Sequence, residues 1–182
     1  MKLITTWGLV FVLALILICL LLFGSKKRRH LTKIGHQRRI TRAEAVLERI
    51  DNIIAQNHEP LPFVIAYLRK IDPLVFEELL LSSFQRQGYK IQRNQRYTGD
   101  GGIDGHVWVS GEKYLVQAKR YKDAIKADHL EEFALVIAQH QASGGFFIHT
   151  GTTPPKCKSV LQQHPEIKLL SGQRLVDFLR CL

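Results

Sequence analysis

The fold is decided by residues 103–119, which read Ile-Asp-Gly-His-Val-Trp-Val-Ser-Gly-Glu-Lys-Tyr-Leu-Val-Gln-Ala-Lys. Two alternating runs flank a Ser-Gly-Glu-Lys turn, a pattern that indicates a β-hairpin. The two-residue loop is either Ser110 and Gly111 or Gly111 and Glu112. The first register places Asp104 opposite Gln117 and the second places it opposite Lys119. Because side chains alternate along a strand, both registers put a carboxylate, an amide and an ammonium group on one face.

The apolar residues of the same hairpin are predicted to share the other face. They are Ile103, Val107, Val109, Tyr114, Val116 and Ala118. We expect this apolar face to pack on the core and the polar cluster to lie on the opposite side of the sheet.

The segments around the hairpin predict alternating helices and strands. Asp72 before Pro73 is a helix-start signal, and Gly88 supplies the stop. The expected elements are a helix over 74–87, a strand over 89–93, a glycine-rich loop over 96–102, a helix near 127–141, a strand over 146–150, a helix near 155–163, a strand over 167–170 and a last helix over 173–182. The fold class is therefore α/β, a mixed central β-sheet flanked by helices, with parallel strands added to one antiparallel hairpin.

Two adjacent glutamates on the first of these helices are expected to have different surroundings. On a helical wheel Glu77 falls near the edge of the apolar stripe, and Glu78 points away from it. Oxygen ligands on neighbouring strands suit a hard cation such as Mg²⁺, and a lysine two positions along can act on an attacked phosphate. Because Gln117 is uncharged, Glu77 is the natural further carboxylate. On spacing alone, an exposed polar strand face explains the same residues at least as well.

Several ordered motifs resemble the Mrr-type restriction endonuclease catalytic domain, a branch of the PD-(D/E)xK nuclease superfamily in its QxK form. They are Phe76-Glu77, Gly88-Tyr89, residues 99–105 (Gly-Asp-Gly-Gly-Ile-Asp-Gly), residues 117–121 (Gln-Ala-Lys-Arg-Tyr), residues 145–150 (Gly-Phe-Phe-Ile-His-Thr) and residues 169–175 (Leu-Leu-Ser-Gly-Gln-Arg-Leu). The resemblance runs from about residue 74 to 182. It implies a restriction-endonuclease-like fold.

The resemblance also implies an activity, the cleavage of DNA with Mg²⁺ or Mn²⁺. Asp104 is then the principal metal ligand, Gln117 stands in the place of the second acid, Lys119 is the catalytic lysine and Glu77 is the helix-borne acid and a further ligand. Asp100 competes with Asp104 but ranks below it, because it lies in the glycine loop. Four further residues have weaker claims: Arg120 and Lys122 are candidate DNA contacts, and His106 and His149 are more simply read as structural.

An uncharged run of 21 residues from Leu3 to Phe23 is long enough to span a bilayer as a helix. It is followed by eight basic residues, which are Lys26, Lys27, Arg28, Arg29, Lys33, Arg38, Arg39 and Arg42. By the positive-inside rule, we expect a single-pass anchor in the bacterial inner membrane with the C-terminal part in the cytoplasm. The basic cluster is expected to contact anionic lipid headgroups, and whether it also contacts DNA is left open.

The predicted organisation is an anchor over 1–24, a basic stalk over 25–70 with an amphipathic helix over 41–57, and a nuclease domain over 71–182. Residues 1–70 hold 12 Lys and Arg against 4 Asp and Glu, a net charge of +8, whereas residues 71–182 hold 14 against 12, a net charge of +2. The basicity thus belongs to the N-terminal part. The stalk is either a plain spacer or a self-associating segment, so homo-oligomers are left open.

Three cysteines without CxxC spacing argue against a cysteine zinc site. Two other functions stay open beside an endonuclease of restriction type. One is a DNA-binding scaffold that keeps the fold without catalysis, and the other is a repair or junction nuclease.

Overall fold

The computed structural model describes residues 34–94 and 102–180. The chain divides into two compact units, residues 1–39 and residues 40–182, and the second holds the sheet. No helix within the described residues is long and apolar enough to cross a membrane. The predicted anchor over 1–24 and the competing ligand Asp100 lie outside the described residues.

Five strands form one mixed sheet in the order β1-β2-β3-β4-β5. Their bounds are β1 Lys90–Arg93, β2 Gly105–Val109, β3 Glu112–Lys119, β4 Gly144–His149 and β5 Ile167–Leu170. Strands β1, β2 and β3 pair antiparallel, and β4 and β5 are added in parallel. The predicted α/β class, with an antiparallel hairpin extended by parallel strands, is confirmed.

Helices precede, connect and follow these strands along the chain. Their bounds are α2 Leu61–Leu68, α3 Pro73–Arg86, α4 Ala127–Gln139, α5 Pro155–Gln163 and α6 Gln173–Arg180, and a further helix covers residues 34–56. The predicted start of α3 is confirmed, because Asp72 accepts hydrogen bonds from the backbone N–H of Leu74 (2.9 Å) and Val75 (3.2 Å). These bonds satisfy donors that the first turn of a helix leaves free.

The hairpin adopts the first of its two predicted registers. Val109 lies opposite Glu112, so that Ser110 and Gly111 form the loop. Both loop residues have positive φ, 52° and 88°. This is the backbone of a type I′ turn, whose twist matches that of the flanking strands.

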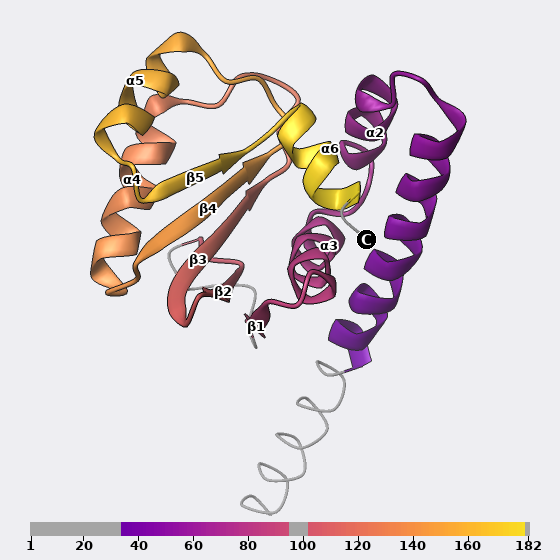
Figure 1. Cartoon of the computed structure of the whole chain (residues 1–182), viewed down its shortest axis with the longest axis horizontal. Coiled ribbons are helices and arrows are strands. Elements are labelled where there is room, and N and C mark those ends of the chain that lie inside the picture. The colour runs from indigo at the N-terminus through magenta and orange to yellow at the C-terminus, as the bar shows by residue number, and fades with distance from the viewer. Residues whose placement is uncertain (1–33, 95–101, 181–182) are drawn as a thin grey trace, which may run out of the picture. The chain divides into compact units, whose positions relative to one another are not determined.

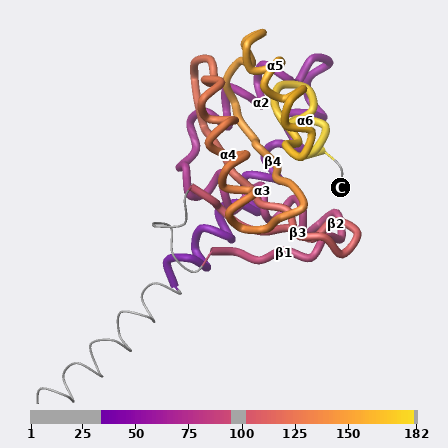
Figure 2. Tube along the Cα trace, turned by 90° about the vertical axis from the view of Figure 1, so that its left-hand side faces the viewer, coloured from indigo at the N-terminus to yellow at the C-terminus, as the bar shows by residue number. Residues whose placement is uncertain are grey.

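Helices cover both faces of the sheet (Figure 1). Val107 and Val116 point into a cluster with α3 and α6, and Leu115 and Phe147 point into a second cluster with α4 and α5. Figure 2, turned by 90°, shows β1, β2 and β3 side by side. The prediction that only one face of the sheet packs on the core is therefore wrong. The connections to the parallel strands β4 and β5 place α4 and α5 on the other face. Ile103 is corrected too: it precedes β2 and packs in the second cluster.

The predicted boundary at residue 71 falls inside the packed unit. Val46, Leu47 and Ile50 of the first helix, and Val64 and Leu68 of α2, are buried in the same cluster as α3. The amphipathic helix predicted over 41–57 is present, and its apolar residues pack in the same cluster as α3. Helix α2 was not predicted, because two prolines so close together favour the end of a helix. In the structure Pro60 is the N-cap of α2 and Pro62 lies in its first turn, where proline is tolerated.

Candidate active site

Asp104 lies immediately before β2, at the edge of the sheet where β3 ends. Its backbone N–H donates to the carbonyl of Val116 (2.8 Å), and its Oδ2 accepts from the N–H of Ala118 (2.6 Å). Burial raises the pKa of this carboxyl to about 6, against the opposing effects of the Ala118 hydrogen bond and the charge of Lys119. The segment is thus held to β3 by two bonds, and Oδ1 remains for a ligand.

Glu77 reaches the same edge from the first half of α3. Burial and the neighbouring charge of Asp104 raise its pKa to about 8, with smaller contributions from Glu78 and Asp72, and Lys119 lowers it. Because the charges of Asp104 and Lys119 both act on Glu77, the three side chains lie in one electrostatic cluster, although helix and strands are far apart in sequence. The structure therefore brings the predicted helix-borne acid to the predicted strand site.

Gln117 is buried on β3, with 7 % of its surface exposed. Its Nε2 donates to the carbonyl of Gly102 (2.9 Å), which leaves the amide oxygen as the donor atom for a ligand. Gly102 has a φ of +80°, and a Cβ there would lie 2.7 Å from Gln117 Nε2 and 3.8 Å from Lys119 Nζ. A glycine at position 102 is required both by the backbone conformation and by the closeness of these side chains.

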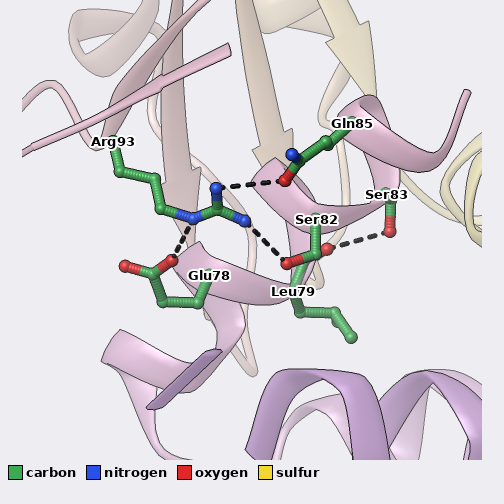
Figure 3. Close-up of polar contacts among 6 residues, drawn as sticks. All are labelled: Glu78, Leu79, Ser82, Ser83, Gln85 and Arg93. Carbon is green, nitrogen blue, oxygen red and sulfur yellow. Dashed lines mark hydrogen bonds and ion pairs between the residues drawn. The ribbon is translucent and has the colours of Figure 1, made fainter. Parts of the chain in front are cut away.

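Glu78 differs from its prediction. It is 2 % exposed rather than solvated, and its Oε2 accepts from Arg93 Nε (2.9 Å) on β1. Figure 3 shows the Arg93 guanidinium lying against the face of α3 that carries Glu78. The helical wheel missed this contact because β1 packs on a flank of α3 that the apolar stripe does not mark.

The weaker candidates have mainly structural contacts. Arg120 donates from Nη1 to the carbonyl of Arg69, whose own guanidinium donates to the carbonyl of Thr150 (2.6 and 3.0 Å). Lys122 is exposed, as a DNA contact would need to be. Arg69 was not singled out by any sequence signal, since its partner lies 81 residues away.

His149 is fully buried at the end of β4, and its Nε2 lies 3.2 Å from Thr153 Oγ1. Burial lowers the pKa of this imidazole to about 4, so the ring is neutral at pH 7. These contacts support the structural reading of His149.

The donor set fits a hard divalent cation. Glu77 and Asp104 are two desolvated carboxylates whose raised pKa values show that nearby cations do not fully compensate their charge. Oxygen ligands of this kind are those that Mg²⁺ takes, with water and phosphate completing the shell. Within residues 34–94 and 102–180, no group of three or more His, Cys, Asp or Glu side chains could hold a metal ion. Among the described residues, the oxygen donors at this place are the carboxylates of Glu77 and Asp104 and the amide of Gln117.

The raised carboxyl pKa of Glu77 predicts a pH dependence of stability. Between pH 6.5 and about 8 the native Glu77 holds a proton that the unfolded chain has released, so metal-free stability should fall as pH rises through this window. At the lower end of this window Asp104, with a pKa of about 6, adds to the fall, and the unfolded imidazole of His149, with a pKa of 6.5, opposes it, so the part due to Glu77 is the difference in slope between wild type and Glu77→Gln. Thermal melts in EDTA across this window test the slope, which Glu77→Gln should flatten. A slope unchanged in Glu77→Gln would disprove the assignment.

A mixed five-stranded sheet with Glu77, Asp104, Gln117 and Lys119 gathered at the end of β3 defines a restriction-endonuclease-like nuclease fold. The restriction endonuclease family of the Mrr catalytic domain matches residues 68–179. The chain belongs to this family.

The chain is similar to one curated protein and to one solved structure. The chain is 33% identical over 123 residues to the type IV methyl-directed restriction enzyme EcoKMrr of Escherichia coli (strain K12), an alignment that covers 64% of this chain and 40% of that enzyme. The chain thus spans well under half of that relative's length. Among solved structures, MspJI restriction endonuclease in complex with a 27-mer oligonucleotide is similar, with a TM-score of 0.48, 21% identity and coverage of 66% of this chain and 30% of that one.

Proposed function

We propose that the domain is a DNA endonuclease that hydrolyses phosphodiester bonds with the help of Mg²⁺ or Mn²⁺. The observation that carries the proposal is the cluster of two desolvated carboxylates, Glu77 and Asp104, next to the ammonium of Lys119. Family membership and the name of the relative EcoKMrr support DNA as the substrate. A defence role of restriction type is the form of this proposal that the family favours.

Each residue has a distinct part in the proposed reaction. Asp104 and Glu77 would hold the divalent ion, and the amide oxygen of Gln117 would contribute a neutral donor in place of a further acid. The ion, when bound, supplies charge stabilisation at the phosphate and activates water. The ammonium of Lys119 lies near both carboxylates and would stabilise the developing negative charge of the attacked phosphate.

The test is cleavage of supercoiled plasmid DNA by the purified full-length chain. We expect nicking or cutting with Mg²⁺ or Mn²⁺ and none in excess EDTA, because no lone side chain here can replace the charge of a metal ion. Cutting that is undiminished in EDTA would refute metal dependence. DNA binding without cutting, under any divalent ion, would favour the scaffold function, and a strong preference for branched DNA would favour junction processing.

We also propose that residues 1–24 anchor this nuclease to the inner membrane, with the domain in the cytoplasm. The uncharged run and the eight basic residues after it support this topology. A periplasm-dependent reporter fused after Leu182 should be inactive, and an active one would refute the orientation.

A further inference from the structure

The end of β1 contacts both segments that carry the carboxylates of the site. Arg93 contacts α3, which bears Glu77, and Asn94 contacts Ile103, the neighbour of Asp104. Two consecutive residues therefore connect the helix-borne and the strand-borne acid. Neither was singled out by the sequence motifs.

Arg93 donates hydrogen bonds to three side chains on one face of α3. Its Nε donates to Glu78 Oε2 (2.9 Å), its Nη2 to Ser82 Oγ (3.1 Å) and its Nη1 to Gln85 Oε1 (3.1 Å), as Figure 3 shows. Residues spaced by four and then three lie on one face of a helix. Because the planar guanidinium binds three residues of one helix face at once, it fixes which face of α3 is turned toward β1. A compact ammonium group, which acts as a single point charge, would not fix this rotation.

The rotation of α3 decides where Glu77 points. Glu77 precedes Glu78 by one residue, about 100° around the helix at 3.6 residues per turn. With the face of Glu78 turned to β1, Glu77 lies about one residue's rotation away, on a part of α3 that is near enough to Asp104 for its charge to act on Glu77. A turn of α3 would separate the two acids.

Asn94 holds the other acid. Its Nδ2 donates to the carbonyl of Ile103, so it joins the two ends of residues 95–102 directly beside Asp104. Asp104 is held on its other side by β3, through the carbonyl of Val116 and the N–H of Ala118.

We propose that Arg93 and Asn94 are positioning residues that fix the positions of Glu77 and Asp104 relative to each other. Arg93 acts on α3 through Glu78, Ser82 and Gln85. Asn94 acts on the segment of Asp104 through the Ile103 carbonyl. This rests on the proposed function, in which the two acids share a divalent ion. Residues that orient metal ligands change metal affinity by about 10- to 100-fold when they are replaced.

The test uses the full-length chain with two variants. The double variant Arg93→Met/Glu78→Leu removes the hydrogen bonds from Arg93 to α3. Because both partners of the ion pair become apolar, no lone buried charge is left, and folded proteins often tolerate such a replacement. Asn94→Ala removes the second contact. Arg86→Met, an exposed arginine on the same helix, and Gln92→Ala, an exposed residue of β1, are the matched controls. All are measured well below their melting temperatures.

Two readouts are used, neither of which depends on cleavage. The first is the affinity for Mn²⁺, expected to fall about 10- to 100-fold in both test variants and to stay unchanged in the controls. The second is hydrogen exchange of the Ala118 amide in the metal-free protein, since its acceptor is the Asp104 carboxylate. Asn94→Ala should speed this exchange while the amides of β4 and β5 keep their wild-type rates.

Three outcomes are decisive. Unchanged Mn²⁺ affinity in both variants would overturn the proposal, because loss of stability alone does not alter the affinity of folded molecules. Faster exchange of all amides together would also overturn it, as that is the sign of a merely structural role. If the wild-type chain binds no Mn²⁺ but Asn94→Ala selectively speeds the Ala118 amide, the metal function fails and the positioning of Asp104 stands.

Discussion

Asp104→Asn is expected to abolish divalent-ion binding and DNA cleavage while the domain stays folded. Asparagine retains an oxygen that can accept from the Ala118 N–H, but it removes the charge that a cation needs. Since burial disfavours that charge at pH 7, the metal-free variant should melt at or above the wild-type temperature. Cleavage should fall by at least roughly a hundredfold to a thousandfold, the usual cost of one electrostatic contact.

Asp104→Ala separates the two roles of this side chain. It also removes the acceptor of the Ala118 N–H, and an unsatisfied buried donor costs about 1–3 kcal/mol. We therefore expect a lower melting temperature for Asp104→Ala than for Asp104→Asn, with equal loss of cleavage. Glu112→Gln, an exposed carboxylate at the other end of β3, is the control and should change neither property. Wild-type metal binding in Asp104→Asn would rule out the site.

Lys119→Met is expected to lose cleavage by roughly a hundredfold to a thousandfold and to keep the metal. The ammonium does not ligate a cation, so its removal takes away the charge that stabilises the transition state and leaves the oxygen donors in place. Because Lys119 lowers the carboxyl pKa values of Glu77 and Asp104, Mn²⁺ binding is measured above the Glu77 pKa of about 8, where both acids are ionised.

The matched control for Lys119→Met lies on the same strand. Lys113→Met removes a partly exposed lysine that lies at the far end of β3 and donates to the carbonyl of His140, and this variant should cut DNA at the wild-type rate. Near-normal cleavage by Lys119→Met would remove Lys119 from the proposed chemistry. Loss of Mn²⁺ binding would instead make it part of the cation site's architecture.

The helical wheel predicted the surroundings of Glu77 but not those of Glu78. The spacing identified Glu77 as the site-facing acid, and its electrostatic interaction with Asp104 agrees with that placement. The same wheel pointed Glu78 away from the apolar stripe, and the structure shows that this side chain is buried against Arg93. We now expect Glu78→Ala to destabilise the domain, because truncating one partner of a buried ion pair leaves the other charge uncompensated.

The sequence by itself determined the local features. The hairpin with its alternation and the capped start of α3 follow from periods and backbone preferences that act over a few residues. The order of strands and helices also indicated the mixed sheet. These features depend on neighbours in the chain, which the sequence displays directly.

Only the tertiary structure decided what depends on distant partners. It extended the packed unit upstream to Ile40, covered the second sheet face with α4 and α5, and buried Glu78 beneath Arg93. It also brought Glu77 on α3 near Asp104, 27 positions later in the chain, and buried both carboxyl groups; burial raises both pKa values, and the charge of Asp104 raises that of Glu77 further. Burial and charge proximity are properties of position in space, which no local periodicity encodes.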